Sequence, residues 1–328
     1  QALSAVTTGG TNTAIGHQAM LTTTTGDGNT GIGNHALENN TTGGSNVAVG
    51  RYALESNTTA SENTAVGYRA AYENTEGGGN TAIGTQALDA NAEGANNVAV
   101  GHDALKAATG GEAVAIGYAA LATMTTAVRN TAVGTEALNA NTTGYNNTAI
   151  GYVAGKAIIE GYQNTLIGDR AGTAITSGDN NTAVGQNALK TATTANENTA
   201  IGWDALTLNT GGQYNVGVGS GVMAANTTGS ENTAVGADAL DANTTGSENT
   251  AVGYQSLSAN TTGTYNVAVG KYALAANTTG TRNLAIGRNT LQACDTENDN
   301  IAIGFNTMTV NNAGGEANVV MGSYAGDA

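Results

Sequence analysis

The chain has 328 residues, with 48 glycines, no proline and a formal net charge of −15 at neutral pH. With only 10 Lys and Arg residues, it lacks the basic patches that bind nucleic-acid phosphates or an anionic membrane surface. No apolar run reaches the length of a transmembrane helix, so we expect no nucleic-acid partner and no membrane insertion. A single cysteine, Cys294, excludes an intrachain disulfide framework.

A five-residue motif, clearest as N-T-A-V-G at 232–236, recurs along the whole chain. Its closing glycine lies at 16, 33, 50, 67, 84, 101, 117, 134, 151, 168, 185, 202, 219, 236, 253, 270, 287, 304 and 322. The spacing is 17 residues, apart from one step of 16 and one of 18. A fixed period over nineteen copies is typical of a solenoid. We therefore predict an all-β parallel β-roll of about nineteen 17-residue coils, forming one continuous rod over residues 1–328 without separate domains.

The repeat has the consensus N-T-A-[VI]-G-x-x-A-L-x-A-N-T-T-G-x-x, whose positions we number from the asparagine. Position four is Val or Ile until Met321, and position two is Thr in eleven copies and Val, Leu or Ile in the other eight. Residues two apart on a strand share a face. The exchange of Thr with apolar residues indicates that positions two and four face the core.

Position three should then point the opposite way, yet it is Ala in most copies and never charged. The Ala-Leu pair at positions eight and nine is apolar on what we take to be two opposite faces. Strands buried on both faces need a layer on each side. A coil with two short strands and two turns is too thin to supply both layers, so we expect another copy to cover the second face. The prediction is a homo-oligomer.

The remaining consensus positions indicate turns. The closing glycine is expected to adopt a backbone angle that other residues avoid, and N-T-T-G reads as a turn. Asparagines at one position should stack into a ladder along the axis. The one-residue deletion near 110–111 and the insertion near 311–312 both fall in the N-T-T-G region, where a solenoid tolerates changes of length.

The segments N-T-A-V-G-Y-Q-S-L-S-A-N-T-T-G-T (249–264) and N-V-A-V-G-K-Y-A-L-A-A-N-T-T-G-T (266–281) resemble the repeats of phage tail-fibre-like and bacterial surface-fibre proteins. The [TV]-A-[VI]-G core is also similar to the head repeat of YadA-like trimeric adhesins, which form a trimeric left-handed β-roll. The period of 17 residues is longer than that of the adhesin repeat, so the geometry of the roll can differ. The resemblance implies a homotrimer that forms part of an extracellular fibre on a cell surface or a virion.

Positions six and seven hold nine of the fourteen aromatic residues and are expected to form an exposed stripe. Amphipathic rings suit a glycan or protein receptor, although a decorated outer turn without a ligand explains the same pattern. The candidate binding residues are Tyr52, Tyr68, Tyr118, Tyr152, Trp203, Tyr254, Tyr272, Phe305 and Tyr324.

Other chemistry is sparse. Three histidines lie in the same two positions, and we expect no Cys, Asp or Glu to complete a metal-ligand set around them; they are His17, His35 and His102. The acidic group Asp295, Glu297 and Asp299 suits calcium in principle, but its spacing fits a polar turn better. Cys294 replaces the turn asparagine and reads as an ordinary thiol or as an interchain contact. No nucleophile with a partnered base is visible. The sequence predicts no enzyme, no cofactor and no metal.

The sequence thus favours a structural or adhesive fibre segment that binds copies of itself. The chain shows no capping repeat, so we also expect end-to-end contacts that extend a filament, or continuation in a longer fibre. Two other classes remain open. Aligned Thr rows suit an ice-binding solenoid, although a Thr at position two that faces inward argues against it. A fibre that binds or degrades glycans, with carboxylates paired across chains, is the other.

Overall fold

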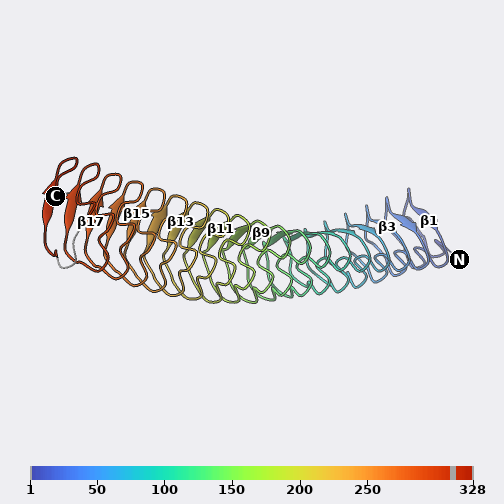
Figure 1. Cartoon of the computed structure of the whole chain (residues 1–328). Helices are drawn as coiled ribbons and strands as arrows, with labels where there is room; N and C mark the ends of the chain where they lie inside the picture. The colour runs from blue at the N-terminus through green and yellow to red at the C-terminus, as the bar shows by residue number, and fades with distance from the viewer. Residues whose placement is uncertain (1, 311–314, 327–328) are drawn as a thin grey trace. The chain divides into compact units, whose positions relative to one another are not determined.

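The computed structural model describes residues 2–310 and 315–326, and across these ranges the chain is all-β and contains no helix. Nor does any described segment form a helix long and apolar enough to cross a membrane. Each 17-residue repeat forms one coil of a parallel β-solenoid, which confirms the predicted fold class (Figure 1). The chain divides into two compact units, Gln1–Gln163 and Asn164–Ala328, and each is described by itself.

The first unit places one three-residue strand in each coil. The strands are β1 (Thr13–Ile15), β2 (Thr30–Ile32), β3 (Val47–Val49), β4 (Thr64–Val66), β5 (Thr81–Ile83), β6 (Val98–Val100), β7 (Val114–Ile116), β8 (Thr131–Val133) and β9 (Thr148–Ile150). Successive strands pair in parallel with equivalent positions opposite one another, as in Ala48 with Ala65. The register follows the period of the repeat.

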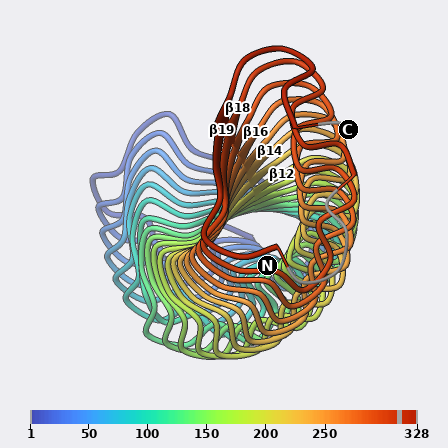
Figure 2. The ribbon, with the colours of Figure 1, turned by 60° about the vertical axis from the view of Figure 1, so that its left-hand side comes forward.

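The second unit has the same construction. Its strands are β10 (Thr165–Ile167), β11 (Thr182–Val184), β12 (Thr199–Ile201), β13 (Val216–Val218), β14 (Thr233–Val235), β15 (Thr250–Val252), β16 (Val267–Val269), β17 (Leu284–Ile286), β18 (Ile301–Ile303) and β19 (Val319–Met321). Figure 2 shows the labelled strands β12 to β19 stacked one behind another. Thr233 pairs with Thr250 and Ala251 with Ala268, so each repeat occupies one rung as predicted.

The strand faces are the reverse of the sequence-based interpretation. Ala234, Ala251 and Ala268 at position three have no exposed surface and point into their own coil. Positions two and four face outward, and Val235 and Val252 at position four are 39% and 36% exposed. The prediction that positions two and four form the core is therefore wrong. Alanine at position three is covered by the coil itself and needs no second chain.

The narrow interior explains why alanine is the inward residue. Position three lies against the side chain at position nine, and the two positions exchange size. Where Leu166 fills position three, position nine is Gly172, and a Cβ there would lie 2.7 Å from the Leu166 side chain. Where position three is Gly217, position nine is Met223. The Met223 Cε atom lies 3.1 Å from the point where a Cβ on Gly217 would be. Close packing of this kind leaves room for a large residue at position three only where position nine is small.

The second half of each coil contains no assigned strand in the described residues, whereas two strands per coil were expected. Positions seven and nine have left-handed backbone, as at Asp238 (φ 53°) and Leu240 (φ 55°), while Ala239 between them does not. Left-handed backbone is costly for a branched residue such as Leu. Hydrogen bonds to both neighbouring coils compensate, because Asp238 N–H donates to Ser220 O and Leu240 N–H donates to Ser256 O. Ala239 and Leu240 are both buried, not on opposite faces.

Two asparagine ladders occupy the remaining interior, which confirms the predicted stacking. At position one, Asn232 Nδ2 donates to Asn215 Oδ1 at 3.1 Å and to Gly246 O at 2.9 Å. At position twelve, Asn243 Nδ2 donates to Asn226 Oδ1 at 2.8 Å. These bonds offset the cost of burying the amides, since an unpaired buried polar group costs about 1–3 kcal/mol.

Of the two repeats with an irregular length, the shortened one lies within the described residues. In the coil of 97–112, Asn97 Nδ2 donates to Gly110 O thirteen residues later, whereas the regular separation is fourteen. The deletion is therefore accommodated within the N-T-T-G turn, as expected. The insertion near 311–312 lies outside the described residues.

Candidate binding surface

The structure places the predicted aromatic stripe on the outside of the coils, next to the closing glycine. Seven of the nine residues are exposed and two are half-buried. The exposed ones are Tyr68, Tyr118, Tyr152, Trp203, Tyr254, Phe305 and Tyr324, and the half-buried ones are Tyr52 and Tyr272. Tyr152 and Trp203 expose 52% and 55% of their surface.

The rings do not form an unbroken stripe. In the first unit His35 stacks on Tyr52 at 5.1 Å between ring centroids, and Tyr52 meets Tyr68 edge-on at 6.2 Å. In the second unit Tyr254 meets Tyr272 at 5.6 Å, and Phe305 meets Tyr324 at 5.4 Å. Polar residues occupy the equivalent positions of intervening coils. The surface therefore offers separate aromatic clusters, each two to four coils long.

Basic side chains cover several of these rings. Arg51 lies 4.5 Å above the ring of Tyr52. Lys271 Nζ lies 5.1 Å from the ring of Tyr254 and 4.9 Å from that of Tyr272. Cation–π contacts of this type are weak where the cation is exposed to water. A sugar that stacked on these tyrosines would have to displace the cation.

The sequence reasoning missed five further aromatic residues outside positions six and seven: Tyr72, Tyr145, Tyr162, Tyr214 and Tyr265. Tyr145 and Tyr162 stack in parallel with centroids 5.1 Å apart and an interplanar angle of 2°. Their separation of 17 residues, one repeat, was the signal that identifies them as neighbours.

A histidine–carboxylate group lies beside the first aromatic cluster. His35 Nδ1 contacts Glu38 Oε2, and one ligand atom each of His35, Glu38 and Glu55 lie within 4.8 Å of one another. Burial and the charge of Glu38 raise the pKa of Glu55, against the opposing effects of His35, Tyr72 and Arg69. The sequence reasoning expected no acid near the histidines, but positions seven and ten meet on the folded coil.

His17 and His102 have other surroundings. The ring of His17 meets that of His35 edge-on at 5.8 Å, as expected for successive coils. His102 Nδ1 lies 3.1 Å from Asp103 Oδ2, and Lys106 Nζ lies 3.1 Å from Asp103 Oδ1. Across residues 2–310 and 315–326, three potential metal ligands converge only at His35, Glu38 and Glu55.

The acidic group near residue 297 behaves as a turn. Glu297 Oε2 accepts hydrogen bonds from Asp295 N–H and Thr296 N–H at 2.8 and 3.0 Å. Burial acts to raise the pKa of Glu297, but these hydrogen bonds, its own N–H and the Cys294 thiol outweigh burial and lower it. Asp299 pairs with Arg282 through two contacts of 2.6 and 2.8 Å. Each carboxylate has its own partner.

Cys294 is fully buried and forms no disulfide, so it offers no surface for an interchain bond. Its Sγ lies 4.0 Å from Glu297 O, at the site where the ladder asparagine normally bonds.

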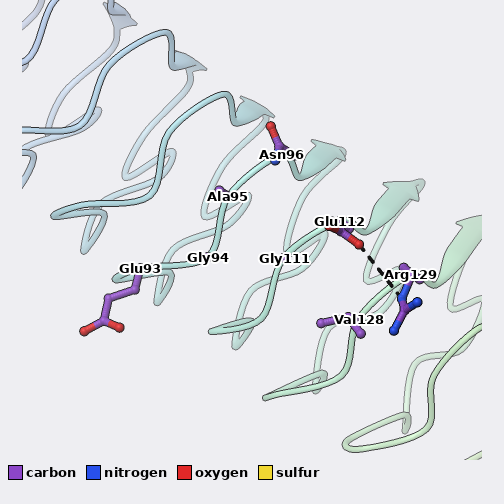
Figure 3. A pocket seen from close by; sticks show the side chains of 8 residues that line it. All are labelled: Glu93, Gly94, Ala95, Asn96, Gly111, Glu112, Val128 and Arg129. Atoms are coloured by element: carbon purple, nitrogen blue, oxygen red, sulfur yellow. Dashed lines mark ion pairs between the residues drawn. The ribbon is translucent and has the colours of Figure 1, made fainter.

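An open groove of about 470 Å³ marks the shortened repeat of the first unit (Figure 3). Its lining residues are Glu93, Gly94, Ala95, Asn96, Gly111, Glu112, Val128 and Arg129. Glu112 Oε2 and Arg129 Nε lie 3.9 Å apart across one side, and both side chains are exposed. The groove is shallow and open to solvent, and it follows from the missing turn residue.

One carboxylate on this surface is expected to make stability depend on pH. Burial and the charge of Asp238 raise the pKa of Asp241 above its ordinary value of 3.8, although backbone hydrogen bonds oppose the shift. A raised carboxyl pKa favours folding below the unfolded pKa, and this contribution is lost as the pH rises through the folded pKa. Asp241→Asn should therefore raise the free energy of unfolding at pH 7 by about 0.5 kcal/mol after solvent screening.

Thermal melts followed by circular dichroism at pH 3 and pH 7 measure this effect. The gain should disappear at the lower pH, where both side chains are neutral. Glu93→Gln on the exposed turn serves as the control and should change neither melt. A gain of equal size at both pH values would contradict the electrostatic explanation.

No protein-family model matches this chain, and a comparison with curated proteins likewise finds no match. The resemblance to fibre repeats therefore rests on the motifs alone.

Proposed function

We propose that the chain is a structural and adhesive segment of an extracellular fibre, built as a homotrimer through the outer face of its strands. The observation that carries this proposal is the apolar row at position four. In the second unit this row includes Val235, Val252, Val269 and Ile286, which are 36–39% exposed. An outward position that met only water should have acquired charged residues, yet none occurs there in nineteen repeats.

A second copy of this chain is the partner that fits this row. The apolar side chains recur once per coil because the register is constant. A partner that buries them all must present its own apolar groups with the same repeat, and another copy has that spacing. Half-exposed Val and Ile side chains of this kind gain about 25 cal/mol for each Å² that they bury. The free-energy gains from many small contacts then add up along the coils.

The test replaces Val235, Val252 and Val269 by lysine and measures the mass in solution by light scattering. Wild type should have three times the chain mass of 32.3 kDa, and the triple variant should have the mass of one chain. Lysines at the exposed turn residues Thr245, Thr262 and Thr279 of the same coils are the matched control and should leave the oligomer intact. Circular dichroism confirms that the variants keep their β-structure.

A wild-type chain that is monomeric over the whole micromolar range would overturn the proposed assembly. So would a triple variant that keeps the wild-type mass. Position-three substitutions, such as Ala251→Lys, do not test assembly, because they place a charge inside the coil.

Ice binding is a second candidate because Thr at position two points outward, not inward as the sequence suggested. Eleven repeats carry this Thr, so a partial row of hydroxyl groups lies on a regular surface. The row is interrupted by Val, Leu and Ile, and position four adds no hydroxyl. The hydroxyl of the Thr at position thirteen is already hydrogen-bonded to the next coil, since Thr227 Oγ1 donates to Thr244 O at 2.9 Å. A thermal-hysteresis measurement distinguishes this function, and a fibre segment should show none.

The exposed aromatic residues support the adhesive part of the proposal. Tyr152 and Trp203 offer large amphipathic rings suited to a glycan or protein receptor. Degradation of the glycan is not part of the proposal.

A further inference from the structure

We propose that His35, Glu38 and Glu55 form a binding site for a divalent transition-metal ion, with Zn²⁺ as its best probe. The three side chains come from two successive coils of the first unit. His35 and Glu38 belong to the coil of 29–45, and Glu55 belongs to the coil of 46–62. A metal held there would join the two coils. This inference is independent of the fibre function.

The geometry suits a small cation. One ligand atom of each residue lies within 4.8 Å of the others. Zn²⁺ holds nitrogen and oxygen ligands at about 2.0–2.2 Å, which puts tetrahedral ligand atoms about 3.4 Å apart. The three groups therefore need only small rotations to converge. One imidazole and two carboxylates leave a fourth position for water.

Ring contacts hold the imidazole in place. His35 stacks on Tyr52 with centroids 5.1 Å apart, and its other neighbour, His17, meets it edge-on at 5.8 Å. Its Nδ1 is thereby directed at Glu38. A ligand whose orientation is fixed before the metal arrives loses less entropy on binding.

The charges also favour a cation. Glu38 and Glu55 face the same point, and Glu55 Oε2 is shielded from solvent without a hydrogen-bond partner among the described atoms. Such an oxygen is costly unless it is paired. Arg69 does not neutralise it directly, because Arg69 binds Asp89 through two contacts of 3.0 and 3.1 Å. Tyr72 supplies one hydrogen bond to Glu55 and brings no positive charge to it.

The first unit contains a built-in comparison. His102 also lies beside a carboxylate, at 3.1 Å from Asp103, but Lys106 occupies the other oxygen of that carboxylate. The ammonium group takes the place that a metal would need. His102 therefore controls for adventitious binding to a surface histidine.

The experiment titrates Zn²⁺ into the full, untagged chain after treatment with a chelator, using calorimetry and thermal melts. We expect one ion per chain at this site and a rise in melting temperature on binding. His35→Gln and Glu55→Gln should each weaken binding at least about tenfold and abolish the thermal shift. His102→Gln should retain both. If His35→Gln perturbs the circular dichroism spectrum, Glu55→Gln decides alone, since it preserves the size of the side chain.

Two results would overturn the proposal. One is the absence of binding heat and thermal shift up to millimolar Zn²⁺. The other is binding by Glu55→Gln with wild-type affinity.

Discussion

Gly236→Ala is expected to destabilise its coil by about 3–5 kcal/mol. Gly236 closes the motif with φ of +135°, a region that side chains disfavour. An added Cβ would lie 2.6 Å from the carbonyl oxygen and 2.7 Å from the carbonyl carbon of Gly253 in the next coil. The Gly253 oxygen accepts hydrogen bonds from Ser256 N–H at 3.3 Å and Ser256 Oγ at 3.0 Å, and Gly253 N–H donates to Val235 O at 2.8 Å, so Gly253 cannot move away without weakening these bonds.

Gly211→Ala is the matched control because it lies in the same unit, in a turn where no described heavy atom comes within 4 Å of the added Cβ. It should leave the melting temperature unchanged or raise it slightly. Melts followed by circular dichroism compare the two variants, and limited proteolysis locates the opened coil. Equal melting temperatures for Gly236→Ala and wild type would show that the closing glycine is not constrained.

The period of the repeat predicted the backbone pairing because a parallel register depends only on spacing. Residues 17 apart had to become neighbours, and Thr233 opposite Thr250 follows directly. The asparagine ladder was predictable for the same reason. Neither inference needed to know which way a side chain points.

The direction of the strand faces was not settled by alternation, which shows only that positions two and four share a face. The sequence did carry a usable signal in its exceptions. Leu166 occurs with Gly172, and Val320 occurs with Gly326, each six residues later. An exchange of size between two positions indicates that they fill one space. This exchange of size indicates that position three faces inward and that the Val and Ile residues at position four face outward.

The cluster at His35 could not be predicted from the sequence, because it depends on the turn geometry. Positions seven and ten meet only when positions seven and nine take left-handed backbone, as at His35 (φ 60°) and Leu37 (φ 51°). Leu rarely adopts this conformation, so residue propensities did not predict it. The aromatic positions were predicted correctly as an outer surface, while their division into clusters follows from the intervening polar residues.

The ladder at position twelve makes a second prediction of large effect, in which one substitution has opposite consequences in two coils. Asn243 Nδ2 donates to Asn226 Oδ1 and to Gly246 O, and its own Oδ1 accepts from Asn260 Nδ2 at 2.9 Å. Asn243→Ile removes all three bonds and leaves the buried amides of Asn226 and Asn260 without these partners. Because each unpaired group costs about 1–3 kcal/mol, we expect a loss of about 2–4 kcal/mol.

Asn141 occupies the same position between coils that carry Met124 and Ile158, so it has no amide above or below it. Its Oδ1 and Nδ2 are both buried without a hydrogen-bond partner among the described atoms. Asn141→Ile removes two unpaired groups and adds apolar contacts, and it should raise the free energy of unfolding by about 1–3 kcal/mol. Chemical denaturation of both variants measures the two shifts. If both substitutions destabilise the chain equally, the asparagines act through size alone. Opposite signs would show that an asparagine stabilises this interior only when the neighbouring coils carry asparagine too.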